Sequence, residues 1–134
     1  MKIIISKRNL ARILSEASRR AYEICGFLLG TRKDDVLEVS EVIFIDNVAS
    51  NKEKAFYMDL IKTYNALMYA SKKSLEIIGV FHSHINSTLP SEKDLKYMKL
   101  WNVLWLIVDS TSKKYRAFIL DNEKLDEVKV ILRN

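Results

Sequence analysis

Between Glu76 and Leu100 the chain reads EIIGVFHSHINSTLPSEKDLKYMKL, which predicts a strand, a loop and a helix in succession. Its first six residues, Glu76–Phe81, are almost wholly apolar, as in a central strand that is covered on both faces. The polar run His82–Pro90 indicates a loop. Ser91 is a good helix N-cap, so we expect a short helix from Ser91 to about Leu100.

The sequence on either side of this stretch adds further strands and helices. The elements expected before it are a short strand at the N-terminus, a helix over Lys7–Tyr22 capped by Ser6, a strand over Ile24–Leu29 stopped by Gly30, a turn over Thr31–Asp35, a strand over Val36–Ile45 and a helix over Asp59–Lys73. The strands expected after it are Val103–Val108, Tyr115–Leu120 and Val128–Leu132. This order predicts one domain over residues 1–134, of the α/β (α+β) class, with a single mixed sheet flanked by helices.

Apolar spacing assigns a face to three of these elements. In the first helix the expected apolar face is Leu10, Ile13, Leu14, Ala17 and Ala21. In the strand over Val36–Ile45 the residues expected on one face are Leu37, Val39, Ile43 and Ile45. Along one side of the second helix lie Leu60, Tyr64, Leu67, Met68 and Ser71. Trp101, Trp105 and Phe118 are expected in the core.

Composition limits the function. The 134 residues carry a net charge of +5 and include one cysteine, Cys25. A single cysteine excludes an internal disulfide and a thiolate-rich zinc site, and a cytoplasmic location is expected. No apolar run is long enough to span a bilayer, and the N-terminus does not resemble a signal peptide. The basic residues are scattered in pairs, so we expect a solvated surface and no nucleic-acid or membrane partner.

The only two histidines, His82 and His84, lie two residues apart at the end of the central strand. Side chains at this spacing point to the same face of an extended backbone, so both imidazoles can converge on one zinc ion. Asp94 stands ten residues later in the first turn of the expected helix, and a loop folding back would bring its carboxylate near them. Three protein ligands leave a fourth position for water, as in catalytic zinc sites.

Each of these features also has an ordinary structural explanation. Many His-x-His pairs are surface or core histidines. Ser91-x-x-Asp94 also matches a capping box, although capping and metal binding do not exclude each other. Cys25 lies in an apolar strand, so it is expected to be a small buried residue rather than a nucleophile. The residues alone therefore leave metal binding and a purely structural role both open.

At these positions the sequence resembles the JAMM (MPN+) metalloprotease family. The family's signature is His-x-His, a short loop and Ser-x-x-Asp, with a glutamate far upstream. The segment Glu23-x-Cys25-Gly26-x-Leu28-x-Gly30 resembles the strand that carries this glutamate. The order of helices and strands also matches over most of the chain. The resemblance implies a JAMM/MPN fold, which is a curved mixed sheet of the cytidine-deaminase-like type.

The resemblance implies a role for each of five polar residues. His82, His84 and Asp94 would bind Zn²⁺. Glu23 would be the general base that takes a proton from the attacking water, and Ser91 would donate a hydrogen bond to the developing oxyanion. The chain departs from the family at Ile85, where proline is common, and the loop before Ser91 is one residue shorter than usual. Both departures bear on substrate fit more than on metal binding.

The resemblance also implies the reaction, which is zinc-dependent hydrolysis of amide or isopeptide bonds at the C-terminal tail of ubiquitin or a ubiquitin-like protein. A processing peptidase for sulfur-carrier proteins or small peptides is one alternative, and a non-catalytic MPN-type scaffold is another. Inactive family members typically lack at least one motif residue, and this chain lacks none. A zinc nucleobase deaminase is excluded, because its signature needs two cysteines. The oligomeric state stays open, with a homodimer as one arrangement.

Overall fold

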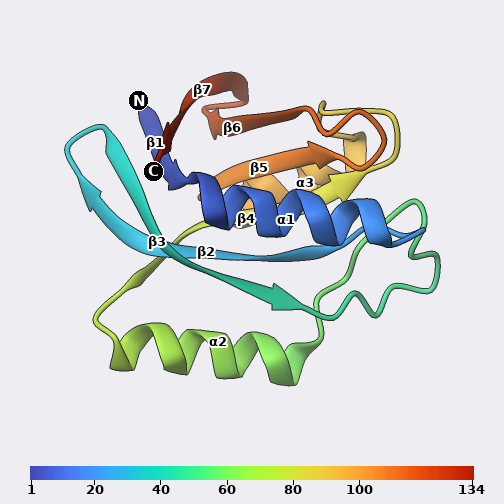
Figure 1. Cartoon of the computed structure of the whole chain (residues 1–134), viewed down its shortest axis with the longest axis horizontal. Helices are drawn as coiled ribbons and strands as arrows, with labels where there is room; N and C mark the ends of the chain where they lie inside the picture. Colours follow the sequence, from blue (N-terminus) through green and yellow to red (C-terminus); the bar gives the residue numbers. More distant parts are fainter.

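The computed structural model describes all 134 residues and contains seven strands and three helices (Figure 1). In chain order the elements are β1 Lys2–Ser6, α1 Lys7–Arg19, β2 Cys25–Lys33, β3 Val36–Ile45, α2 Leu60–Lys72, β4 Glu76–His84, α3 Glu92–Leu100, β5 Leu104–Asp109, β6 Tyr115–Asp121 and β7 Lys124–Arg133. Ser6, Asp59 and Ser91 are the N-caps of the three helices. No helix has the length and apolar character that crossing a membrane requires.

The strands form one mixed sheet in the order β1-β3-β2-β4-β5-β6-β7, and this sheet closes into a barrel. Closure occurs because β1 pairs in parallel with both β3 and β7. The central strand β4 lies between antiparallel β2 and parallel β5. The expected mixed α/β fold is therefore confirmed, and the sheet also closes on itself, which was not predicted. Closure depends on pairing between the two ends of the chain, which no local pattern reveals.

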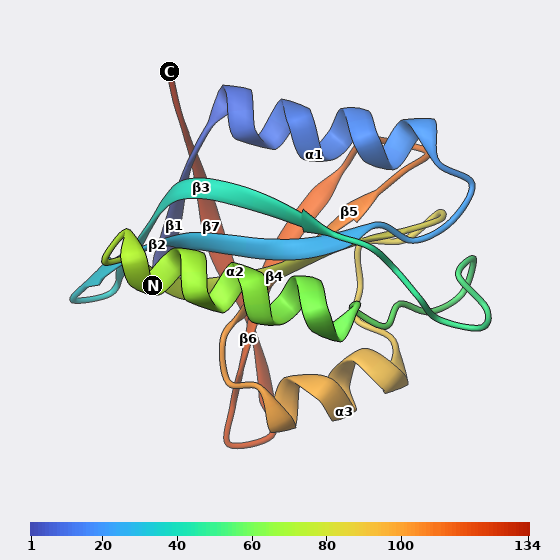
Figure 2. The same ribbon diagram turned by 90° about the horizontal axis from the view of Figure 1, so that it is seen from below.

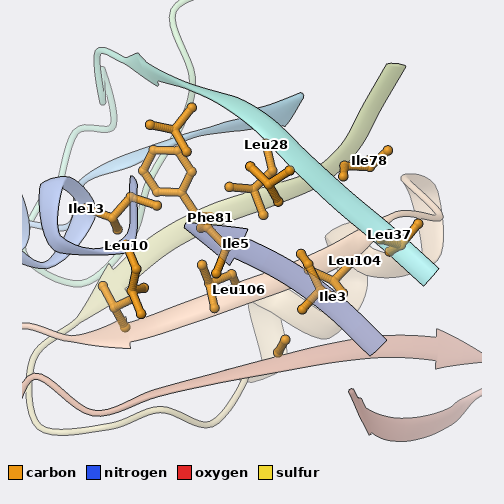
Figure 3. Close-up of a cluster of buried hydrophobic side chains, with 14 of the residues drawn as sticks. Ile3, Ile5, Leu10, Ile13, Leu28, Leu37, Ile78, Phe81, Leu104 and Leu106 are labelled. Carbon is orange, nitrogen blue, oxygen red and sulfur yellow. The ribbon is translucent and has the colours of Figure 1, made fainter. Parts of the chain in front are cut away.

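The helices divide the buried side chains into two clusters. Helix α1 lies on one side of the strands and α3 on the opposite side (Figure 2). Leu10, Ile13 and Ala17 of α1 pack in a cluster with Ile5, Phe81 and Leu106, among others (Figure 3). The second cluster joins Ala66 and Ala70 of α2 and Met98 of α3 to residues of β2, β4 and β5, including Val80 and Trp105. We call the second side the α2–α3 face, and the site described below lies at one end of it.

Gly30 does not end its strand as expected, because β2 continues through it to Lys33. The strand register shifts between Leu29 and Gly30, and Ser40 of β3 is left without a partner in this register. A Cβ atom at Gly30 would collide with the main-chain oxygen of Glu38, so glycine is needed here for close approach of the two strands. This irregularity also reverses the alternation along β3. Leu37 and Val39 therefore join the α1 cluster while Ile43 and Ile45 join the α2–α3 face, and the prediction of one shared face is wrong.

Helix α2 turns a different side to the sheet than its larger apolar residues suggest. Ala66 and Ala70 are buried, whereas the side that bears Leu60, Tyr64, Leu67 and Met68 is exposed. Small residues at spacing i, i+4 let the helix approach the sheet closely.

The first helix ends at Arg19 rather than Tyr22, and β4 extends through both histidines rather than ending at Phe81. The extension of β4 fixes the geometry of the two imidazoles.

Candidate metal centre

Strand β4 places both histidines on the α2–α3 face. Val80, His82 and His84 alternate with Phe81 and Ser83, and Val80 packs on the α2–α3 face while Phe81 packs in the α1 cluster. His82 is fully buried and His84 is 8% exposed. The Nε2 atoms of the two imidazoles lie 3.0 Å apart. The expected convergence of the two rings is therefore present.

Asp94 reaches the histidines from the first turn of α3. Its main-chain N–H donates to Ser91 Oγ at 3.1 Å, and its carboxylate accepts from the Ser91 main-chain N–H at 2.9 Å, so the expected capping box is present. The same carboxylate oxygen, Oδ2, lies 3.2 Å from His82 Nε2 and 3.0 Å from His84 Nε2. The capping box thus holds the Asp94 side chain in the direction of the imidazoles.

These three ligand atoms fit a tetrahedral cation. Zinc bonds of about 2.0–2.1 Å require ligand atoms about 3.3–3.4 Å apart, close to the 3.0–3.2 Å separations of His82, His84 and Asp94. Two imidazole nitrogens this close cannot both carry a hydrogen directed at each other. One imidazole lone pair each from His82 and His84, together with a carboxylate oxygen, is a common zinc donor set.

Electrostatics favour a neutral His82 beside an ionised Asp94. Burial lowers the pKa of His82, because the charged imidazolium is costly away from water. Burial works against ionisation of Asp94 as well, but the hydrogen bonds with His82 and His84 outweigh it and hold the Asp94 pKa below its usual range. Burial also opposes the charge on His84, but its hydrogen bond with Asp94 raises its pKa overall. Deprotonated imidazole and carboxylate are the forms that bind a metal, so His82 and Asp94 are ready to bind, whereas a metal would have to displace any proton on His84.

Glu23 meets this group from a distant part of the sequence. It lies in the connection between α1 and β2, and it is 6% exposed. A carboxylate oxygen of Glu23 and one ring nitrogen of each histidine lie within 4.8 Å of one another. Burial raises the pKa of Glu23 to about 7. A carboxyl group with this pKa can both take up and release a proton near neutral pH.

Ser91 and Glu23 lie on the wall of one cleft. The cleft has a volume of about 510 Å³, and it is lined by Glu23, Glu53, Lys54, His84, Ile85, Ser87, Leu89, Pro90 and Ser91. Ser91 Oγ accepts a hydrogen bond from Asp94, so its hydroxyl hydrogen remains free to donate into the cleft. The structure therefore brings all five predicted site residues to one place.

Two residues that the sequence did not single out support the histidines. Ser83, between them, points to the other side of β4, where its Oγ accepts from the Ile24 main-chain N–H at 2.8 Å. This bond ties β4 to the residue that follows Glu23. The ring of Phe56 packs on the His82 ring, with centroids 4.5 Å apart. His82 Nδ1 has no hydrogen-bond partner, whereas metal-binding histidines usually have one. In the sequence, only the position of Ser83 between the two histidines could have indicated its role, and nothing indicated the role of Phe56.

Cys25 plays no part in this group. Its side chain is buried, and its thiol lies 3.3 Å from the main-chain oxygen of Ile45, to which it donates. Burial raises the Cys25 pKa to about 12, so the thiolate that a nucleophile requires is absent near neutral pH. The expectation of a small buried residue is confirmed.

The chain is similar to a protein family, to a named relative and to solved structures. Residues 6–121 match the family described as prokaryotic homologs of the JAB domain. The chain is 41% identical over 132 residues to the desampylase of Pyrococcus furiosus, a match that covers 97% of this chain and 90% of the relative. The solution structure of DSY2949 from Desulfitobacterium hafniense superposes with a TM-score of 0.85 at 26% identity, covering 98% of this chain and 92% of that one. A Salinibacter ruber protein superposes with a TM-score of 0.71 at 25% identity, covering 100% and 92%.

Proposed function

Since the chain belongs to the family of prokaryotic homologs of the JAB domain, we propose that it is a zinc-dependent isopeptidase that acts on ubiquitin-like protein conjugates. The resemblance to JAMM proteins expected from the motif is thereby confirmed at the level of the family. The relative named desampylase, 41% identical to this chain, supports an isopeptidase rather than another hydrolase. The whole chain, residues 1–134, would act as one catalytic domain in the cytoplasm.

One observation carries the proposal. The Nε2 atoms of His82 and His84 and Oδ2 of Asp94 are 3.0–3.2 Å apart, and a Glu23 oxygen lies within 4.8 Å of both imidazoles. We assign His82, His84 and Asp94 as the zinc ligands. Zinc bound there would supply a Lewis acid that polarises the substrate carbonyl and lowers the pKa of water to about 7.

The side chains around that position have complementary tasks. Glu23 accepts a proton from the attacking water at its carboxylate and passes it to the leaving amine, which suits a carboxyl group with a pKa of about 7. The Ser91 hydroxyl donates to the carbonyl oxygen as negative charge develops on it. The apolar rings of Phe56 and Trp105 exclude water from the far side of His82.

The loop after His84 borders the place where substrate would lie. Ile85 is 45% exposed and Leu89 is 53% exposed, and both line the cleft. An extended C-terminal tail can lie between this loop and the segment that carries Glu53 and Lys54. Ile85 replaces the proline that is common in the family, so this position bears on tail selectivity rather than on metal binding.

The experiment compares substrates on zinc-loaded protein. A ubiquitin-like protein joined through its C-terminus to a lysine side chain is incubated beside the same protein in linear fusion and beside a short peptide of the tail sequence. We expect cleavage of the isopeptide-linked conjugate, with loss of activity on chelation and recovery on addition of zinc. Cleavage of the short peptide alone would instead indicate a processing peptidase. No cleavage of any substrate by zinc-loaded protein would favour a non-catalytic scaffold.

A further inference from the structure

Asn47 is a buried polar side chain outside the motif, and it has no role in the function proposed above. It lies two residues after the end of β3 at Ile45 and is 6% exposed. Its Nδ2 donates to the main-chain oxygen of Glu23 at 2.8 Å and to that of Ala55 at 3.0 Å. Its Oδ1 accepts from the main-chain N–H groups of Ala49 and Tyr57, both at 3.0 Å.

The carboxamide of Asn47 makes all four hydrogen bonds open to it. Two donors meet two carbonyl oxygens, and two acceptor positions meet two N–H groups, so the reversed amide orientation would lose every bond. No other residue type of this size offers two donors together with two acceptor positions. A fully satisfied buried network of this kind specifies one conformation of the segments that it joins.

Those segments are the Glu23 backbone and the loop between Asn47 and Met58. An isolated bridge between Asn47 and Met58 closes the base of the loop, and the Asn47 side chain bonds to main-chain groups of three loop residues. Figure 1 shows this loop at the same end of the molecule as the connection between α1 and β2 that carries Glu23. The loop contributes Glu53 and Lys54 to the cleft.

Glu23 depends on this loop for its position. The pairing of β2 with β3 and with β4 begins at Cys25, so the main chain of Glu23 lies outside the sheet. Its N–H donates to the main-chain oxygen of Lys52 within the loop at 2.7 Å, and its carbonyl oxygen accepts from Asn47 Nδ2. Both main-chain groups of Glu23 are therefore held by the segment that Asn47 organises.

We propose that Asn47 is a positioning residue that fixes the Glu23 carboxylate against the two imidazoles and holds the adjoining cleft wall. The inference rests on the proposed function for its catalytic consequence, but the placement of Glu23 can be measured without any substrate. Asn47 does not contact the metal ligands, so its loss should leave the affinity for zinc near that of the wild type.

The test uses Asn47→Ala and Asn47→Asp in the full chain. Asn47→Ala removes all four bonds, whereas Asn47→Asp keeps the acceptor side and loses both donors, including the one to Glu23. Ile3→Ala is the control for general destabilisation, because Ile3 is buried in the α1 cluster. The proteins are compared by crystal structure, zinc affinity, kcat and KM on the isopeptide conjugate, and amide hydrogen exchange. All solution measurements are made below the lowest melting temperature among the variants.

We expect kcat to fall about 10- to 100-fold in both Asn47 variants, with zinc affinity retained, as for residues that orient catalytic groups. The crystal structures should place Glu23 farther from the imidazoles. Exchange at Ala49 and Tyr57 should accelerate in Asn47→Ala and stay slow in Asn47→Asp, which a general loss of stability would not produce.

Two results would overturn the inference. One is a Glu23 carboxylate that stays in place in both variants. The other is a kcat equal to that of Ile3→Ala. An inactive wild type with bound zinc would instead refute the proposed function, and the crystal structures would still decide the role of Asn47.

Discussion

The two halves of the candidate site are built in opposite ways. The metal corner (His82, His84 and Asp94) comes from thirteen consecutive residues, and a strand and a capping box organise it. The base side (Glu23 with the loop Asn47–Met58) joins parts of the chain that are distant in sequence, and side-chain bonds to the main chain hold it. In the proposed function, local geometry would therefore bind the ion, and tertiary contacts would place the base beside it. Substitutions should separate these two contributions.

The largest effect is expected in the metal corner, from Asp94→Ala. The substitution removes one oxygen ligand and half of the capping box, and it leaves two buried imidazoles facing each other. We expect zinc binding to be lost and turnover to fall more than about 10³-fold, because catalysis through the ion then fails altogether. Metal analysis of the purified variant and a cleavage assay measure both. Wild-type zinc content in Asp94→Ala would contradict the ligand assignment.

Ser91→Ala tests the residue that caps α3 and lines the cleft together with Glu23. Loss of an oxyanion donor costs about 10²–10³ in kcat, so we expect a fall in that range with zinc retained. The variant also loses the N-cap of α3, at about 1 kcal/mol. Asp59→Ala is the matched control, because it removes the N-cap of α2 at similar cost and should leave kcat unchanged. Equal activity of the two variants would leave Ser91 a structural role only.

The same contrast explains what could be predicted from the sequence. His82, His84 and Asp94 follow from strand alternation and helix capping, which are local rules. Glu23 was found only through family resemblance, because nothing near it in sequence indicates what it meets in space. Asn47 gave no signal for the same reason. In the fold, the elements were predictable, whereas barrel closure and the reversed alternation in β3 depend on contacts between distant strands.

The pH dependence of stability tests the burial of Glu23. Burial raises its pKa to about 7 from an ordinary value of 4.5. Between these values the unfolded chain releases the proton while the folded chain keeps it, so rising pH destabilises metal-free wild type by at most about 3 kcal/mol. Glu23→Gln has no titrating group at this position, so it does not show this loss of stability with rising pH. Urea unfolding of both proteins at pH 5 and pH 8 should give stabilities that diverge in favour of Gln, and parallel behaviour would contradict a buried carboxyl group.

Cys25→Ala should have the smallest effect, although Cys25 pairs directly with His82 across β2 and β4. The buried thiol has a pKa of about 12, so it supplies no nucleophile. We expect activity within about twofold of wild type and a stability loss of about 1–2 kcal/mol. Native protein should also resist alkylation by iodoacetamide at pH 8. Rapid labelling with loss of activity would require a reactive role for Cys25.

The division into a metal corner and a base side is tested most directly by Glu23→Gln and His84→Ala, with zinc content and cleavage rate measured on the same samples. The account predicts that Glu23→Gln keeps the zinc of the wild type and loses turnover by about 10²–10⁴-fold, while His84→Ala loses both zinc and turnover. Normal turnover in Glu23→Gln, or loss of zinc equal to that of His84→Ala, would contradict it.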